Sequence, residues 1–342
     1  MPRAAVAAFA AECLESDIVS IEEIPAGLGL RRFYRIHLRG APGSVIARVE
    51  AAEDPAGRPA NTAPEPPLEP LRSYLEQHGL PVPHRLGGDA NLGIELHEDC
   101  GDLTLERAAA LAPEHRTRWT RRVVDTLPHL QSVPADPAIP AFGRHLDEAL
   151  FLYKAELFQQ WSLPTGLGRP ATPGEATVVR EAFLWIARSA ADAPQRLAHR
   201  DLQSRNLLLS APTANARITW IDLQGAFLAP PEYDLVCLLR DSYLPTPEPE
   251  VDTLLRDVAA ALPDVIQPST LRRRFDLLTL TRKGKDHARF LVAATTRGQT
   301  AELAHLPATA RMLHRAAEAC AGFAPELSRL ADLIQTLPEH AS

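Results

Sequence analysis

The chain reads HRDLQSRN at residues 199–206 and IDLQ at residues 221–224, and these two short stretches decide the fold. Asp201 and Asn206 stand five residues apart on what the sequence predicts as one tight loop, so their side chains can face one point from opposite sides. Asp222 follows sixteen residues after Asn206, at the end of a short apolar strand. Two carboxylates and one amide oxygen are therefore expected to converge.

This set of side chains suits phosphoryl transfer from ATP. Such a reaction needs one carboxylate that accepts a proton from the attacking hydroxyl, here Asp201. It also needs hard oxygen ligands that hold Mg²⁺ against the phosphates, here Asn206 and Asp222. The alternative is a loop whose Asp and Asn only cap helices. His199 has two interpretations as well, and bracing the loop is favoured over acting as a base because Asp201 fills that role.

The regions around this loop predict an α+β protein of two unequal lobes. Residues 1–97 read as a small β-rich N-lobe with one or two helices, and residues 98–342 as a larger, mostly helical C-lobe. The expected N-lobe strands are Ile18–Ile24, Phe33–Leu38, Ser44–Val49 and a pair ending near Ile94–His97, with a helix over Leu68–His78. The expected C-lobe helices are Leu103–Leu111, Thr117–Gln131, His145–Trp161, Gly174–Ala191 and most of the chain after Tyr233.

The composition excludes several classes of partner. A net charge of −7 over 342 residues gives no basic excess to neutralise nucleic acid phosphates. No apolar run reaches the about 18 residues that a membrane span requires. The four cysteines stand far apart and form no CxxC pair, which is typical of reduced thiols in a cytoplasmic protein. We therefore expect a cytoplasmic protein without nucleic acid or membrane partners; a monomer is favoured, although the sequence leaves the oligomeric state open.

Several stretches resemble one known family. They are RRFYRIHL (31–38), GLPVP (79–83), LDEALFLYKAELFQQW (146–161), HRDLQSRNLLL (199–209), ITWIDLQGAFLAPPEYDLVCLLRDSY (218–243) and APELSRLADLIQTLP (324–338). The chain resembles the aminoglycoside phosphotransferase superfamily, a small-molecule branch of the protein-kinase-like fold. Within it, the chain is most similar to the amino-sugar kinases of bacterial cell-wall recycling. The resemblance implies a bilobal protein-kinase-like fold.

The resemblance also implies where the nucleotide binds. Gly27 and Gly29 would lie in the loop over the phosphates of ATP, and the backbone of Glu98 to Cys100 would form the hinge that holds the adenine. Asp201 would be the catalytic base, and Mg²⁺ would bind Asn206 and Asp222.

Asp234 has an implied supporting role. The resemblance assigns to it the bracing of the catalytic loop by hydrogen bonds, while a helix N-cap after Tyr233 is the other interpretation, and both can hold at once.

One departure from protein kinases concerns the third strand. The stretch VIAR at residues 45–48 places Arg48 where protein kinases have a lysine. Arginine can still pair with phosphate oxygens, although its planar head changes the geometry. Glu69 is the natural partner on the following helix, with a solvated carboxylate at a helix start as the alternative.

Candidate substrate contacts are less sharply defined. Arg205 could neutralise the transferred phosphoryl group or touch the acceptor, with a salt bridge inside the C-lobe as the alternative. Asp241 could bind a sugar hydroxyl beside Arg240, with a buried structural pair as the alternative. Glu156 is a weaker candidate.

The stretch Leu271–Arg289 carries seven basic and two acidic residues. If this helix face lines the cleft, it favours a neutral or anionic acceptor over a polycation. Arg282 and Lys285 are the better candidates, and solvated helix faces are the alternative for the others.

These features together predict an ATP- and Mg²⁺-dependent kinase. The expected acceptor is the anomeric hydroxyl of N-acetylmuramate or N-acetylglucosamine, which would give a sugar 1-phosphate. Another alcohol of the aminoglycoside, choline or homoserine type is the competing acceptor. A non-catalytic pseudokinase is the competing interpretation outside enzymes, motivated only by Arg48.

Overall fold

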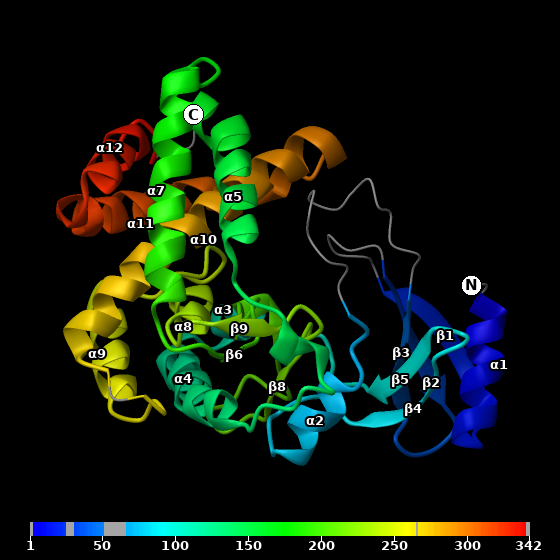
Figure 1. Cartoon of the computed structure of the whole chain (residues 1–342). Coiled ribbons are helices and arrows are strands. Elements are labelled where there is room, and N and C mark those ends of the chain that lie inside the picture. Colours follow the sequence, from blue (N-terminus) through cyan, green and yellow to red (C-terminus); the bar gives the residue numbers. More distant parts are fainter. Residues whose placement is uncertain (1–2, 25–30, 51–65, 265, 340–342) are drawn as a thin grey trace.

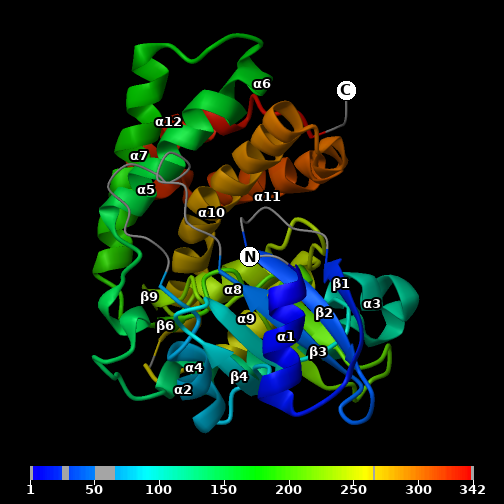
Figure 2. The same cartoon turned by 90° about the vertical axis from the view of Figure 1, so that its right-hand side faces the viewer.

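An antiparallel sheet of five strands dominates the N-lobe of the computed structural model, which describes residues 3–24, 31–50, 66–264 and 266–339 (Figure 1). The strands are ordered β1-β2-β3-β5-β4, with bounds β1 Ile18–Ile24, β2 Arg32–Leu38, β3 Ser44–Val49, β4 Arg85–Asp89 and β5 Ile94–Glu98. Helix α1 (Arg3–Leu14) lies across the outer face of the sheet, away from the C-lobe helices (Figure 2).

The strands divide their side chains between two faces because neighbouring residues of a strand point in opposite directions. On β3, Val45 and Ala47 are buried and join Val6 of α1 in a small hydrophobic core. Arg48 on β3 and His97 on β5 fall on the opposite face, which looks toward the C-lobe. The alternation thus places polar side chains in the space between the lobes.

The C-lobe is built from helices around a larger hydrophobic core. Its helices of seven or more residues are α3 Leu105–Leu111, α4 Arg116–Ser132, α5 Glu148–Leu157, α7 Pro173–Ala191, α8 Tyr233–Leu239, α9 Glu248–Ala259, α10 Pro268–Arg297, α11 Leu306–Cys320 and α12 Pro325–Ile334. The short α6 Leu163–Leu167 lies between α5 and α7. Leu71 and Leu75 of α2 (Leu71–Gln77) belong to this larger core rather than to the core of the sheet.

Two small antiparallel ribbons carry the sequence motifs. One pairs β6 (Arg196–Ala198) with β9 (Phe227–Ala229), and the other pairs β7 (Leu207–Leu209) with β8 (Ile218–Trp220). The HRDLQSRN loop connects β6 with β7, and the IDLQ stretch follows β8 directly. Each motif is therefore held at the end of a short, buried strand.

The predicted α+β class and the bilobal fold are confirmed. The helix predicted over Leu68–His78 is shorter and spans Leu71–Gln77. The helix predicted over His145–Trp161 also differs from its prediction. It begins at Glu148 because the Asp147 side chain accepts a hydrogen bond from the Leu150 backbone N–H and caps it. It continues beyond Leu157 as a π-helical turn.

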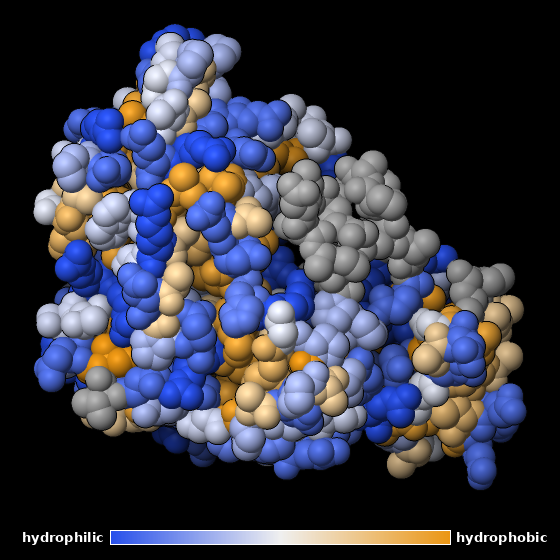
Figure 3. Space-filling model, in the orientation of Figure 1, coloured by the Kyte–Doolittle hydropathy of each residue, from blue (hydrophilic) through white to orange (hydrophobic). Residues whose placement is uncertain are grey.

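No helix within the described residues is long and apolar enough to cross a bilayer. The face shown in Figure 3 is a mosaic of hydrophilic and hydrophobic residues.

Helix α10 contains a buried histidine that makes stability depend on pH. His287 contacts the Ser162 hydroxyl at 3.0 Å, and burial lowers the pKa of His287 to about 4. The unfolded chain binds a proton near pH 6.5, so the contribution of the neutral ring is fully present above that pH and is lost toward pH 4. Between pH 7 and pH 5 this loss is about 2 kcal/mol.

We therefore expect chemical denaturation to show a larger loss of unfolding free energy from pH 7 to pH 5 in the native protein than in His287→Gln. The expected difference is about 2 kcal/mol. Equal losses in the two proteins would contradict the assignment.

Candidate active site

A carboxylate at the start of α8 holds the HRDLQSRN loop through hydrogen bonds. Asp234 accepts hydrogen bonds from the backbone N–H groups of His199 at 2.7 Å and Arg200 at 3.0 Å. Arg200 has a φ of +80°, a left-handed conformation that is uncommon for a residue with a side chain. The two bonds stabilise this strained backbone directly before Asp201.

The Asp201 carboxylate lies beside a fully buried arginine of α10. Arg282 Nη1 donates to Asp201 Oδ1 at 2.8 Å and to the Arg200 carbonyl at 2.9 Å. Burial alone would raise the pKa of Asp201, but the charges of Arg282, Lys285 and Arg200 hold it well below its usual range. Asp201 is therefore ionised at neutral pH and can accept a hydrogen bond from an incoming hydroxyl.

Asn206 and Asp222 are oriented by hydrogen bonds that leave oxygens available. Asn206 Nδ2 donates to the Asp201 carbonyl at 2.7 Å, and Gln224 Nε2 donates to Asp222 Oδ1 at 2.5 Å. The Asn206 amide oxygen and the second Asp222 oxygen remain as acceptors, and hard oxygen donors of this kind suit Mg²⁺.

A magnesium site here would have few protein ligands. In the described part of the chain, no three His, Cys, Asp or Glu side chains gather into a metal site. A cation at this position would rest on one carboxylate, one amide oxygen and oxygens of the phosphate substrate, which is how Mg²⁺ usually binds beside nucleotides.

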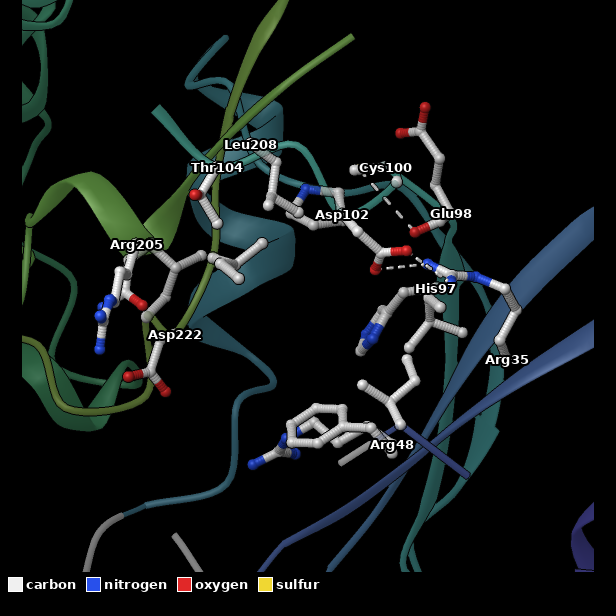
Figure 4. A pocket seen from close by; sticks show the side chains of 18 of the residues that line it. Arg35, Arg48, His97, Glu98, Cys100, Asp102, Thr104, Arg205, Leu208 and Asp222 are labelled. Carbon is white, nitrogen blue, oxygen red and sulfur yellow. Dashed lines mark hydrogen bonds and ion pairs between the residues drawn. The ribbon is translucent and has the colours of Figure 1, made fainter. Parts of the chain in front are cut away.

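A cavity of about 830 Å³, the interlobe cavity, separates the sheet from the C-lobe (Figure 4). Arg48 and His97 line it from the N-lobe, and Asn206 and Asp222 line it from the C-lobe. Figure 4 shows Asp222 with Arg205 on one side and Arg48 with His97 on the other. The volume falls in the usual range for a small-molecule or cofactor site.

Arg48 does not pair with Glu69 as expected. Glu69, in the turn before α2, pairs instead with Arg72 in the first turn of that helix and accepts a hydrogen bond from the Ser73 backbone N–H at 3.0 Å. The short separation in sequence keeps Glu69 close to Arg72, whereas Arg48 lies on another element. Glu69 does not line the interlobe cavity, whereas Arg72 does.

The Arg48 guanidinium is only partly satisfied. Its Nη1 pairs with Glu50 at 2.5 Å, while its Nη2 is buried without a hydrogen-bond partner among the described residues. Burial lowers the pKa of Arg48, with Glu50 acting in the opposite direction. A buried N–H of a cation without an acceptor, in a cavity wall, suits an anionic ligand.

The expected hinge closes one end of the interlobe cavity. Glu98 pairs with Arg217 across the lobes, and Asp99 holds Arg35 at 2.7 Å. Cys100 also lines the cavity, and burial raises the pKa of its thiol to about 11, so it stays protonated. These ion pairs fix the hinge backbone against both lobes.

The expected phosphate loop with Gly27 and Gly29 lies outside the described residues.

A second cavity of about 810 Å³, the C-lobe cavity, opens on the other side of the HRDLQSRN loop. Asp201 and one face of α10 line it. Asn206, Asp222 and Arg205 line both cavities. The two cavities therefore meet at the side chains that the sequence singled out, with the carboxylate of Asp201 on the side of the C-lobe cavity.

Arg205 forms salt bridges inside the C-lobe, which was the alternative interpretation of this residue. Its guanidinium pairs with Glu106 at 2.8 Å and with Glu302 at 3.1 Å, and it stacks on Tyr243 at 3.6 Å from the ring centre. These acidic partners lie 99 and 97 residues away in the chain, so no local pattern of sequence indicated them. Arg205 still lines both cavities, where it links the loop to the segment after α10.

Arg240 and Glu156 are corrected as substrate candidates. Arg240 is 2% exposed and pairs with Glu248 and, at 3.6 Å, with Asp276. A buried guanidinium needs such partners because an unpaired buried charge is costly. Glu156 is exposed on α5, and neither residue lines the two cavities.

Asp241 lines the C-lobe cavity but is occupied by the backbone. Its Oδ2 accepts from the Ser204 N–H at 2.7 Å, and its Oδ1 accepts from the Tyr243 N–H at 2.9 Å. Asp241 and Arg240 do not form the buried pair that was the alternative. Asp241 fixes the turn between Asp201 and Asn206 instead.

His199 supports the loop through its backbone rather than its ring. Both ring nitrogens are buried without a hydrogen-bond partner in the described part of the chain. The ring packs edge-on against Trp220, with 6.1 Å between ring centres. The expected hydrogen-bond brace is thus formed by its N–H to Asp234.

The comparison with protein families decides the classification. Residues 20–269 match the model of the phosphotransferase enzyme family. The chain belongs to this family. It is 28% identical to the N-acetylmuramate/N-acetylglucosamine kinase of Pseudomonas aeruginosa over 287 residues, covering 81% of each chain.

Solved structures of several kinases and phosphotransferases have a similar fold. The gentamicin complex of the phosphotransferase APH(2")-IIa has a TM-score of 0.60 at 14% identity, with 92% of this chain and 99% of that chain covered. The choline kinase LicA from Streptococcus pneumoniae has a TM-score of 0.59 at 14% identity, with 91% and 98% covered. The family member is thus a phosphotransferase of protein-kinase-like fold, as the sequence predicted.

Proposed function

We propose that this phosphotransferase moves the γ-phosphoryl group of ATP to the anomeric hydroxyl of N-acetylmuramate or N-acetylglucosamine. The observation that carries the reaction is the meeting of two cavities at Asn206 and Asp222, with Asp201 facing the second cavity. The similarity to amino-sugar kinases over 81% of the chain supports the acceptor. The product is a sugar 1-phosphate.

The residues divide the reaction between the two cavities. ATP lies in the interlobe cavity with its phosphates between Arg48 and Asp222, and the sugar lies in the C-lobe cavity beside Asp201. The ionised Asp201 orients the hydroxyl and takes its proton as the new oxygen–phosphorus bond forms. Since its pKa is low, the proton moves late, which suits a loose transition state in which the leaving bond is already long.

Asn206 and Asp222 would hold Mg²⁺ through the oxygens that their hydrogen bonds leave available. The ion supplies positive charge that neutralises the phosphate oxygens as ADP leaves.

We also propose that residues 1–97 act as the nucleotide lobe and residues 98–342 as the catalytic and substrate lobe. The separate core of the sheet supports this division, with α2 docked on the larger core. The four cysteines are unpaired, which supports a cytoplasmic site of action, where ATP is available. The expectation of a monomer stays a prediction.

Arg48→Gln tests the nucleotide site. The substitution removes a charged donor from the phosphates, so the KM for ATP should rise roughly 10- to 100-fold. Arg39, which is exposed on the same lobe, supplies the control Arg39→Gln. An unchanged KM for ATP in Arg48→Gln would show that this residue does not bind the nucleotide.

An acceptor panel tests the proposed function. ADP release is measured with N-acetylmuramate, N-acetylglucosamine, an aminoglycoside, choline and homoserine, each with ATP and Mg²⁺. The proposal predicts turnover with the amino sugars. Turnover with another alcohol and none with the amino sugars would replace the acceptor, and no turnover with any alcohol would favour a pseudokinase.

A further inference from the structure

One face of α10 lines the C-lobe cavity with charged side chains. Arg282, Lys285, Asp286 and Arg289 recur at spacings of three and four residues, so they lie on one side of the helix. Arg282 holds Asp201 at one end of this row. Arg289 lies two turns further along, about 10 Å along the helix axis.

The row contains more positive charge than its carboxylate can balance. Asp286 receives Arg282 at 3.2 Å, Lys283 at 2.6 Å and Lys285 at 3.3 Å. Burial, followed by the charge of Arg282, lowers the pKa of Lys285 to about 8. The cavity wall would therefore gain from a further negative charge supplied by a ligand.

Arg289 is the member of the row best placed to receive that charge. It is exposed to the cavity and makes no ion pair or hydrogen bond with the described residues. Arg205, at the opposite wall, is balanced by Glu106 and Glu302. Arg289 thus differs from the other arginines of the site in having its guanidinium free.

We propose that Arg289, together with Lys285, binds the carboxylate of an acidic amino sugar, so that the enzyme prefers N-acetylmuramate to N-acetylglucosamine. This inference rests on the proposed function. The two sugars differ by a lactyl ether on carbon 3, which is separated from the anomeric carbon by one ring carbon. With the anomeric hydroxyl beside Asp201, that carboxylate extends along α10 toward Arg289, whose planar head can bind it through two parallel hydrogen bonds.

The same charges disfavour other acceptors of this family. A polycationic aminoglycoside would place amines against Lys285 and Arg289, where like charges repel. A neutral sugar would leave the guanidinium of Arg289 solvated, so this residue would neither weaken nor strengthen the binding of that sugar. The row therefore discriminates by charge rather than by the shape of the ring.

The test compares kcat/KM for the two sugars in the native enzyme, Arg289→Gln, Arg289→Lys and the control Arg180→Gln, in which an exposed arginine of α7 is changed. The ratio of N-acetylmuramate to N-acetylglucosamine should fall at least roughly tenfold in Arg289→Gln, through the KM for N-acetylmuramate. Arg289→Lys should keep part of the preference because it keeps the charge. Arg180→Gln should leave the ratio unchanged.

Two outcomes would overturn the inference, and they differ in what they imply for the proposed function. A ratio in Arg289→Gln within about twofold of the native ratio, with both sugars still phosphorylated, overturns the inference and leaves the proposed function in place. A native enzyme that phosphorylates neither sugar overturns both.

Discussion

Replacing Asp201 by Asn lowers kcat by roughly 10²- to 10⁴-fold while the dissociation constant for ATP stays within about twofold. The amide keeps the size of the carboxylate but can no longer take the proton of the attacking hydroxyl. Because Asp201 lines the C-lobe cavity and not the interlobe cavity, the nucleotide site is not altered directly. ADP release gives kcat, and calorimetric titration with ATP and Mg²⁺ gives the dissociation constant.

The control for this substitution is Asp192→Asn, which changes an exposed carboxylate at the end of α7. It should leave both quantities unchanged. Turnover of Asp201→Asn at the native level would remove Asp201 from the role of base, whatever the acceptor.

Arg282→Gln should have the largest effect on stability. Arg282 is 2% exposed and contacts Asp201 and Asp286, so the substitution removes the ion-pair partner of Asp201 and one of the three cations around Asp286. Breaking a buried ion pair from one side costs about 3–5 kcal/mol. A chain of this size should then unfold about 4–7 °C earlier, and kcat should fall as well, because Asp201 loses the group that orients it.

Two further variants are informative. Arg282→Lys tests whether the positive charge at this position is enough, and Arg273→Gln is the control for losing an arginine elsewhere on α10. The lysine keeps a positive charge beside Asp201 and should recover part of the lost stability. Arg273 is exposed on the same helix and stacks on Phe323, so its substitution should change the unfolding temperature little. An Arg282→Gln protein as stable as the native one would show that the pairs on α10 do not hold the loop.

That Asp201, Asn206 and Asp222 lie close together could be predicted from the sequence. Asp201 and Asn206 belong to one loop, and Asp222 follows the strand beside it, so spacing alone places them together. The N-lobe strands were also predictable, since their Ile and Val residues alternate with polar ones. In both cases the pattern that gives the prediction is read from a short stretch of sequence.

The substrate side could not be predicted in the same way, because its contacts join distant parts of the chain. Arg205 pairs with Glu106 and Glu302, and Arg240 pairs with Glu248 and Asp276. Because the partners are far apart in the chain, no local sequence pattern predicts such pairs.

The partner of Glu69, in contrast, could have been predicted from the sequence. Arg72 stands three residues after it, a helical spacing at which opposite charges meet, and this competing partner was visible in the sequence.

The most direct measurement is phosphorus NMR of the purified product formed from ATP and N-acetylmuramate. A phosphate on the anomeric carbon couples to the single anomeric proton and gives a doublet, and a proton–phosphorus correlation spectrum identifies that proton as the anomeric one. This is the result that the proposed reaction predicts, whereas a doublet that correlates with another ring proton would contradict it. A phosphate on the methylene carbon couples to two protons and gives a triplet-like signal. That pattern, or a spectrum that shows only inorganic phosphate, would contradict transfer to the anomeric hydroxyl.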